Sequence, residues 1–403
     1  MKFHQETLDN GLTIVGEQRE HAACCAIGFF VRTGSRDETP EVSGVSHFLE
    51  HMLFKGTDKR NALELTYELG SIGAQSNAYT NEENTVYYVY VLPEYFAQAF
   101  DILSDMMRPA LDVNEFNTEK NVILEEIALY EDRPMFKLYE AAMEQYFKGH
   151  TAGNSVLGTN ASITALSRDQ MKAYYDKRYA PNNMTLAVSG AFDWEEVVGL
   201  AKKHCGAWPS MEVERQYPEH KPVESEKVIK KDDLQMAHVC FVGEGPSATD
   251  ENRYAGYLLA CLLGDGTGSR AYWELIDTGL ADGASVEIDE MDRAGAFYAC
   301  VSGLPEKIDE LSGIMANILK TPMEFDDEAL ERVKTKIRTR LVLSGESSPR
   351  RLMSIGNEWN YRRSYSTLDQ ELARLNAVSR KDIEDFLSNY PLKPFTKVSM
   401  LPS

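Results

Sequence analysis

The chain repeats two short motifs at one fixed distance, and this repeat constrains its fold more than any other feature. Residues 92–94 (Leu-Pro-Glu) open a segment with helical periodicity, and residues 304–306 repeat this motif 212 positions later. Residues 165–168 (Ala-Leu-Ser-Arg) precede a helix and then a strand, and residues 377–380 (Ala-Val-Ser-Arg) do the same at the offset of 212. Two matches in the same order and at the same spacing indicate two homologous halves.

The length of the chain leads to the same expectation. Its 403 residues exceed the size at which one hydrophobic core usually keeps growing, so at least two domains are expected. Prolines at positions 209, 218 and 222, within a run of mixed charge, interrupt the periodic pattern between the halves. We therefore predict a first domain over residues 1–208, a linker over 209–230 and a second domain over 231–403.

Each half alternates between strand-like and helical segments. In the first half, residues 12–16, 25–33, 75–80 and 85–92 are typical of strands, and the last two predict a hairpin. Helical periodicity runs through residues 44–54, 63–69, 94–107, 115–130 and 135–147. Strands in adjacent groups, with helix pairs between them, predict the α+β class. Each half is expected to hold a mainly antiparallel sheet with helices packed on one face.

The segment 44–54 (Gly-Val-Ser-His-Phe-Leu-Glu-His-Met-Leu-Phe) contains residues that can bind a metal or take part in catalysis. On a helix, His47 and His51 lie one turn apart on the same face, so both imidazoles can reach one metal ion. Glu50 falls on nearly the same face, and the residues between are apolar, which predicts a buried helix. Buried polar groups need partners. Zinc suits this pattern, although a pair of core histidines hydrogen-bonded to Glu50 would also produce it.

A catalytic zinc site usually has three protein ligands and one open position, so a third ligand is needed. Glu126 is the candidate, because it lies in a second helical segment, 119–127, that has its own apolar face. Glu119 precedes it by two turns on the same face. Its carboxylate could accept a hydrogen bond from a ligand histidine, as groups around metal sites commonly do.

These segments resemble the pitrilysin–insulinase family of zinc metallopeptidases. The His-x-x-Glu-His order is the inverzincin pattern, and the surrounding sequence is most similar to the short-chain branch that includes the β subunit of mitochondrial processing peptidase. The resemblance covers nearly the whole chain. It favours Glu126 over Glu125 as ligand and gives Glu119 a supporting position. It also implies a substrate-binding edge strand, made here by Asn77, Ala78, Tyr79 and Thr80, and a chamber built by two chains or four such domains.

The second half departs from this pattern. The offset of 212 maps His47, Glu50 and His51 onto Leu259, Leu262 and Leu263, and Glu126 onto Arg338, so no metal ligand is expected there. Family members that are active as single chains usually carry an Arg and a Tyr that bind the substrate and polarise its carbonyl. Here Ile276 and Asp282 stand at those positions. Either a paired second protein would supply the missing groups, or another residue of this chain would replace them.

The composition narrows the range of partners. A net charge of −21 argues against binding to nucleic acid, which needs a basic face. No segment resembles a signal peptide or approaches the roughly 20 apolar residues of a membrane helix, so we expect no membrane partner. The six cysteines form no C-x-x-C pair. Buried thiols are the expectation, which favours a cytoplasmic location.

The residues and the resemblance together predict a zinc-dependent endopeptidase that hydrolyses short or unfolded peptides, with Glu50 as the general base and Zn²⁺ as the cofactor. The acidic charge suggests that basic peptides enter most readily. A dimer is expected, either of identical or of different chains. The alternative is a zinc- and peptide-binding subunit of a heterodimeric peptidase, inactive without the partner that supplies the Arg and Tyr.

Overall fold

The computed structural model describes residues 1–222 and 224–403, which form two compact units. Unit 1 consists of Met1–Ile127, Asn154–Gln216 and Leu343–Ser366, and unit 2 of Ala128–Gly153, Tyr217–Val342 and Thr367–Ser403. Neither unit is contiguous in sequence. The boundaries predicted from the sequence concern the duplicated segments and stay a prediction. In the packing units, one segment of the first half belongs to unit 2 and one segment of the second half belongs to unit 1.

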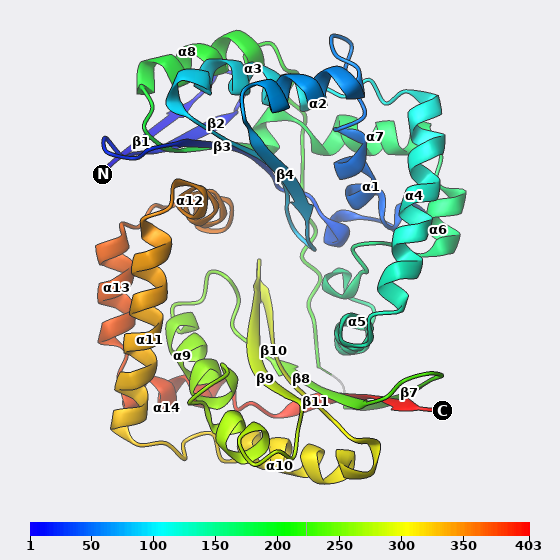
Figure 1. Ribbon diagram of the computed structural model, residues 1–403, viewed down its shortest axis with the longest axis vertical. Helices are drawn as coiled ribbons and strands as arrows, with labels where there is room; N and C mark the ends of the chain where they lie inside the picture. Colours follow the sequence, from blue (N-terminus) through cyan, green and yellow to red (C-terminus); the bar gives the residue numbers. More distant parts are fainter. Residues whose placement is uncertain (223) are drawn as a thin grey trace. The chain divides into compact units, whose positions relative to one another are not determined.

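Unit 1 is built on a six-stranded mixed sheet in the order β1-β2-β6-β3-β5-β4 (Figure 1). All neighbouring strands pair antiparallel except β2 and β6, which are parallel. Strand β4 forms one edge of the sheet. The strands are β1 (Lys2–Thr7), β2 (Thr13–Gln18), β3 (Cys25–Val31), β4 (Gln75–Thr80), β5 (Thr85–Val91) and β6 (Met184–Gly190).

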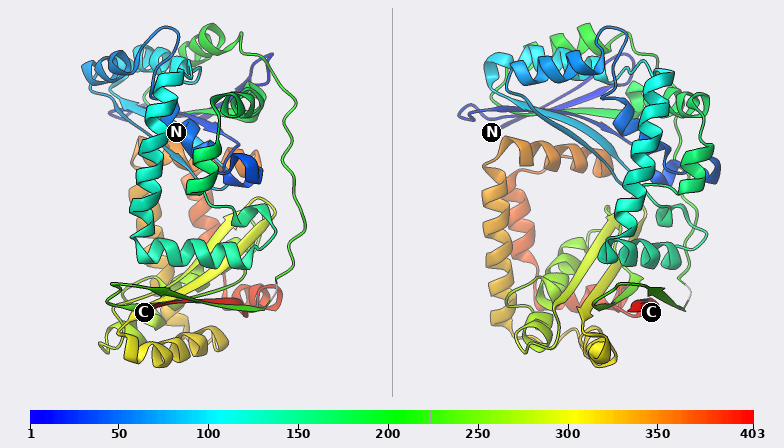
Figure 2. Two further views of the ribbon diagram at one scale, coloured as in Figure 1. Left: turned by 90° about the vertical axis from the view of Figure 1, so that its right-hand side faces the viewer. Right: turned by 45° about the vertical axis from the view of Figure 1, so that its right-hand side comes forward.

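The helices of unit 1 cover both faces of this sheet (Figures 1 and 2). Strands β3 and β6 are buried along their whole length, so side chains on both faces need apolar cover. Helices α3 and α8 pack on one face and α12 on the other. The helices are α1 (Val45–Met52), α2 (Ala62–Ser71), α3 (Phe96–Met106), α4 (Val113–Glu131), α6 (Asn160–Ala165), α7 (Arg168–Arg178), α8 (Trp194–Cys205) and α12 (Ser348–Arg362), with 3-10 turns η1 (Ser35–Asp37), η2 (Pro40–Val42), η3 (Pro93–Tyr95) and η5 (Pro181–Asn183).

Helix α12 comes from the second half of the sequence but completes the core of unit 1. Leu352, Ile355 and Trp359 pack against apolar side chains of the sheet. The backbone approach is close, because a Cβ on Gly356 would stand 2.2 Å from the ring of Phe30. The helices expected on one face of the sheet are present, and the exchanged helix adds a layer on the second face.

Unit 2 repeats this plan with a five-stranded mixed sheet in the order β7-β11-β8-β10-β9 (Figure 1). Only the β11–β7 pair is parallel. The sheet carries a large apolar core on one face, and helix α5, from the first half of the sequence, packs on β8 and β11. The strands are β7 (Ser225–Lys231), β8 (Ala237–Glu244), β9 (Gly283–Met291), β10 (Ala294–Gly303) and β11 (Pro394–Pro402).

Two helices of unit 2 repeat helices of unit 1 at the predicted offset. Helices α3 and α10 begin 212 residues apart, as do α7 and α14, so the duplication predicted from the sequence is confirmed. The helices are α5 (Pro134–Tyr146), α9 (Arg253–Gly264), α10 (Ile308–Lys320), α11 (Asp327–Gly345), α13 (Leu368–Ala377) and α14 (Arg380–Asn389), with short turns η4 (Thr151–Gly153) and η7 (Pro305–Lys307) and the π-helix η6 (Tyr272–Ile276).

Two further features concern expectations from the sequence. Residues 209–222 and 224 of the predicted linker, 209–230, lie outside helices and strands, but β7 begins within the predicted range at Ser225. Across the described part of the chain, the structure contains no helix with the length and apolar character needed to cross a membrane.

Candidate metal centre

Helix α1 presents the two histidines, and its first turn is anchored by a buried acid. Gly44 stands at its N-terminal end with φ of 88°, a conformation that favours glycine, and a Cβ there would lie 2.6 Å from the carbonyl oxygen of Leu157. The carboxyl oxygens of Glu38 accept hydrogen bonds from the backbone N–H groups of Gly44 (2.6 Å) and Ser46 (2.8 Å). The helix therefore begins at a fixed point, since two of its otherwise unpaired donors are satisfied.

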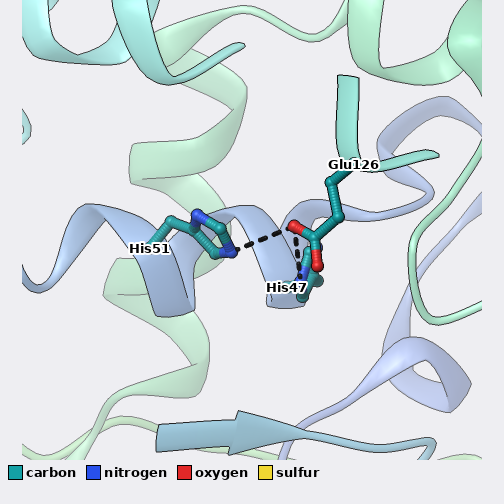
Figure 3. Close-up of side chains that lie close together, drawn as sticks. All are labelled: His47, His51 and Glu126. Carbon is teal, nitrogen blue, oxygen red and sulfur yellow. Dashed lines mark ion pairs between the residues drawn. The ribbon is translucent and has the colours of Figure 1, made fainter. Parts of the chain in front are cut away.

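His47, His51 and Glu126 converge in unit 1 (Figure 3). Glu126 Oε2, from α4, lies 3.4 Å from His51 Nε2 and 3.7 Å from His47 Nε2. One ligand atom from each residue falls within 4.8 Å of the others. The helical spacing of the two histidines and the position of α4 thus aim three donor atoms at one point.

This spacing fits a zinc ion. Zinc binds histidine nitrogen at about 2.0–2.1 Å and carboxylate oxygen at about 2.0–2.2 Å in a tetrahedron, so its ligand atoms stand roughly 3.4 Å apart. The two nitrogen–oxygen separations in the cluster are close to that value. Two imidazoles and one carboxylate also leave a fourth position open, as catalytic zinc sites do.

The two imidazoles are held in different ways. His51 Nδ1 donates to Glu119 Oε1 at 2.8 Å, and the second oxygen of Glu119 lies 2.6 Å from Lys55 Nζ. This bond leaves Nε2 of His51 as the atom that faces Glu126. His47 is more buried, and in the described residues its Nδ1 has no hydrogen-bond partner. Packing, rather than an acceptor, holds the ring of His47.

The electrostatic environment differs accordingly. Burial, followed by the nearby His51, lowers the pKa of His47 to about 4. Burial acts to lower the pKa of His51 as well, but the hydrogen bonds and charges of Glu119 and Glu126 outweigh it and raise that pKa to about 9. The hydrogen bond from His51 is the main cause that lowers the pKa of Glu126. The cluster thus concentrates negative charge around two nitrogen donors, an environment that favours a cation.

Glu50 lies beside the cluster on α1 and does not take part in it. Its Oε2 accepts a hydrogen bond of 2.7 Å from the hydroxyl of Thr80, the last residue of β4. Burial raises the pKa of Glu50, while the bond from Thr80 acts to lower it. A partly buried carboxyl group with a raised pKa, adjacent to a possible metal position, has the properties of a proton acceptor.

The four residues of the predicted substrate strand occupy the edge strand β4 and differ in their surroundings. Asn77 is exposed, and its Oδ1 accepts from the backbone N–H of Ala78 at 2.9 Å. Ala78 is buried. Tyr79 packs with the aromatic residues on the α12 face of the sheet. Thr80 alone of the four hydrogen-bonds a side chain of α1.

Two supporting residues were not identified from the sequence. Glu38 has a recognisable position, since an acid before a helix start is favoured by the helix dipole, but the intervening turn hides the connection. Lys55 follows His51 by four residues, a spacing that keeps side chains close when a helix continues. Helix α1 ends at Met52, so only the fold reveals that Lys55 reaches Glu119.

The second half has no equivalent cluster in the residues that the structure covers. Leu259, Leu262 and Leu263 are buried in the core of unit 2, as expected for positions that need no ligand. Helices α4 and α11 begin 214 residues apart, and counted from these starts Glu126 aligns with Arg340, whereas the offset of 212 gives Arg338. Either residue is an arginine, and a guanidinium cannot bind a metal cation.

The positions expected to carry an Arg and a Tyr lie in unit 2 beside the π-helix η6. Ile276, the last residue of η6, is partly buried against the core of unit 2. Asp282 is exposed, and its backbone N–H donates to the carbonyl oxygen of Ser302. The isoleucine side chain has no hydrogen-bond donor, and a carboxylate only accepts hydrogen bonds. Neither residue therefore replaces an Arg or a Tyr as a donor to a substrate carbonyl.

Comparisons with known proteins identify the family of this chain. Residues 13–160 match the family model described as insulinase (peptidase family M16), and residues 165–337 match that of the peptidase M16 inactive domain. The zinc protease YmxG of Bacillus subtilis, itself uncharacterized, is 30% identical over 406 residues, covering 98% of this chain and 99% of that protein. An uncharacterized zinc protease of Rickettsia bellii is 31% identical over 385 residues, covering 94% of this chain and 93% of its own.

Solved structures show the same fold. A protease from Helicobacter pylori aligns with a TM-score of 0.91 at 22% identity, covering 100% of this chain and 99% of that chain. A putative M16-like peptidase from Alicyclobacillus acidocaldarius aligns with a TM-score of 0.84 at 24% identity, covering 100% and 98%. Because YmxG is 30% identical over nearly its whole length and family models match both halves, the chain belongs to the insulinase family of peptidases, family M16.

Proposed function

We propose that the protein is a zinc-dependent endopeptidase in which His47, His51 and Glu126 hold Zn²⁺ and Glu50 is the general base. The observation that carries this proposal is the convergence of three donor atoms within 4.8 Å beside a carboxyl group that is not one of them. A structural zinc site would use four protein ligands, whereas this cluster offers three.

The residues in and beside the cluster of unit 1 have separate roles in the proposed peptide hydrolysis. Zinc, when bound, supplies Lewis-acid chemistry that makes water more acidic and polarises a carbonyl. Glu50 Oε2 is engaged by Thr80, which leaves Oε1 to remove a proton from the attacking water and pass it to the leaving amine nitrogen. Glu119 keeps the Nε2 of His51 directed at the cluster through its bond to Nδ1.

The free edge of β4 is the proposed binding site for an extended peptide, which would add as a strand to the sheet. The N–H of Ala78 supports this role. It donates to the side chain of Asn77, an acceptor that a peptide carbonyl could replace. The net charge of −21 favours basic peptides. This charge preference, a dimeric assembly and a cytoplasmic location stay predictions.

A second function is motivated by the side chains at Ile276 and Asp282. The chain would then bind zinc and peptide but depend on a partner chain for the groups that polarise the substrate carbonyl. The two functions differ in one observable property. A self-sufficient enzyme cleaves peptides alone, whereas the subunit gains activity only when its partner is added.

The test uses the purified full chain and a mixture of unstructured peptides of about 20 residues. Zinc content and cleavage are measured for the wild type, for Glu50→Gln and for Glu126→Gln. We expect Glu50→Gln to keep zinc and lose most turnover, and Glu126→Gln to lose both. Glu125→Gln is the matched control, because Glu125 is the exposed neighbour of Glu126 and should retain zinc and activity.

The outcomes separate the alternatives. Cleavage by the wild type that a chelator abolishes supports the self-sufficient enzyme. Stoichiometric zinc without cleavage, followed by activity once a co-purified chain is added, supports the dependent subunit. If the wild type binds no zinc, or if Glu125→Gln and Glu126→Gln behave alike, the proposed metal centre is wrong.

A further inference from the structure

Thr80 makes a contact that the role of a peptide-binding strand residue does not explain. Its Oγ1 donates to Glu50 Oε2 at 2.7 Å across a separation of 30 residues. Within the described parts of the chain, this is the single hydrogen bond that the Glu50 carboxylate accepts. The nearby hydroxyls of Tyr87 and Tyr179 pair with each other at 2.8 Å and not with Glu50. The direction of the Glu50 carboxylate therefore depends on Thr80.

The backbone fixes where this hydroxyl stands. Alternation along β4 places Ala78 and Thr80 on the face toward α1, and Tyr79 on the opposite face with α12. Thr80 pairs with Thr85 at the end of the β4–β5 hairpin. The side chain of Asn81, in the turn that follows, accepts from two backbone N–H groups at 2.9 and 2.7 Å. The donor is thus attached to a hairpin end whose turn is closed by hydrogen bonds.

We propose that Thr80 is a positioning residue for Glu50, holding Oε2 so that Oε1 faces the position of the attacking water. This inference rests on the proposed role of Glu50 as general base. It differs from the expectation that Thr80 contacts the peptide, because a positioning residue acts on turnover and a contact residue acts on peptide binding. It also connects the edge strand directly to the helix that carries the base.

The kinetic test compares Thr80→Val, which keeps the branched shape but removes the donor, with Thr80→Ser, which keeps the donor. We expect Thr80→Val to lower kcat roughly 10- to 100-fold, the usual effect of losing a hydrogen bond to a charged group, with KM within about twofold. Thr80→Ser should restore most of the activity. Thr66→Val is the control, since Thr66 is exposed on α2 and bonds only its own helix.

A binding test separates positioning from contact without turnover. The affinity for one fluorescently labelled basic peptide is measured for Glu50→Gln and for Glu50→Gln combined with Thr80→Val. Affinities equal within about twofold support the positioning role. A loss of tenfold or more in the double variant would identify Thr80 as a peptide contact and overturn the inference, as would an unchanged kcat in Thr80→Val.

A structural readout keeps the inference testable if the wild type cleaves no peptide, an outcome that would refute the proposed function instead. Crystal structures of Thr80→Val and Thr80→Ser would be compared with that of the wild type. A Glu50 carboxylate that rotates away only in the valine variant supports the inference. A carboxylate that keeps its direction in Thr80→Val shows that other groups hold it, and the inference fails.

Discussion

The exchanged helix α12 is joined to the sheet of unit 1 by a buried ion pair, and breaking this pair tests the packing described above. Glu17 of β2 is fully buried and Arg351 of α12 is 4% exposed. Arg351 Nε lies 2.9 and 3.1 Å from the two oxygens of Glu17, and Nη2 makes a further short contact. The hydroxyl of Tyr365 donates to Glu17 Oε2 at 2.9 Å. In the part of the chain that the structure describes, the hydrogen bonds to this carboxylate come from the segment that the second half contributes.

Replacing Arg351 by methionine keeps an apolar stem and leaves Glu17 with Tyr365 alone. Removing one partner of a buried pair costs about 3–5 kcal/mol, because a charge stays buried without compensation. Since Tyr365 still satisfies one acceptor site, we expect a loss of about 3 kcal/mol. The double variant Glu17→Leu with Arg351→Met removes both charges and should recover most of this loss.

Native-state hydrogen exchange read by mass spectrometry measures the effect locally, which matters because unfolding of a two-unit chain need not be two-state. Amides of β2 and α12 should exchange roughly 100-fold faster in Arg351→Met. Arg350→Met, which removes an exposed neighbour that donates to the hydroxyl of Ser344, should change little. Equal effects at positions 350 and 351, or no recovery in the double variant, would refute the reasoning.

Three further outcomes follow from the site and its surroundings. Glu119→Ala should weaken zinc binding about 10- to 100-fold in chelator competition, because it releases His51, and an unchanged affinity would contradict that role. Adding a chelator should lower the thermal midpoint of the zinc-loaded wild type but not that of Glu126→Gln, since a ligand bound to the folded state stabilises it by mass action. Burial raises the pKa of Glu38 from 4.5 to about 8, so the folded state binds the proton more tightly than the unfolded state. The stabilisation of the folded state by this proton is fully present below pH 4.5 and is lost as the pH rises through 8. In urea unfolding, the free energy of unfolding of the wild type, relative to that of Glu38→Gln, should fall by on the order of 4 kcal/mol between pH 4.5 and pH 8. Parallel pH profiles of the two proteins would contradict this prediction.

The sequence by itself determined the parts of the protein that depend on local geometry. The four-residue spacing of His47 and His51 places both rings on one helix face in any helix, so this pair could be proposed as metal ligands without the fold. The repeated motifs determined the two halves for a similar reason, since each motif marks the start of its own helix. The choice of Glu126, which lies three helices further along the chain, needed the resemblance as well.

Only the tertiary structure decided which distant segments meet. The bond from Thr80 to Glu50 depends on the face that β4 turns toward α1, and a shift of one residue in the β4–β5 register would reverse it. The pairing of Glu17 with Arg351 joins residues 334 positions apart, and no local pattern records it. The exchange of α5 and α12 has the same origin. Each sheet has two apolar faces, the helices of its own half cover one, and the chain alone does not show which helix covers the other.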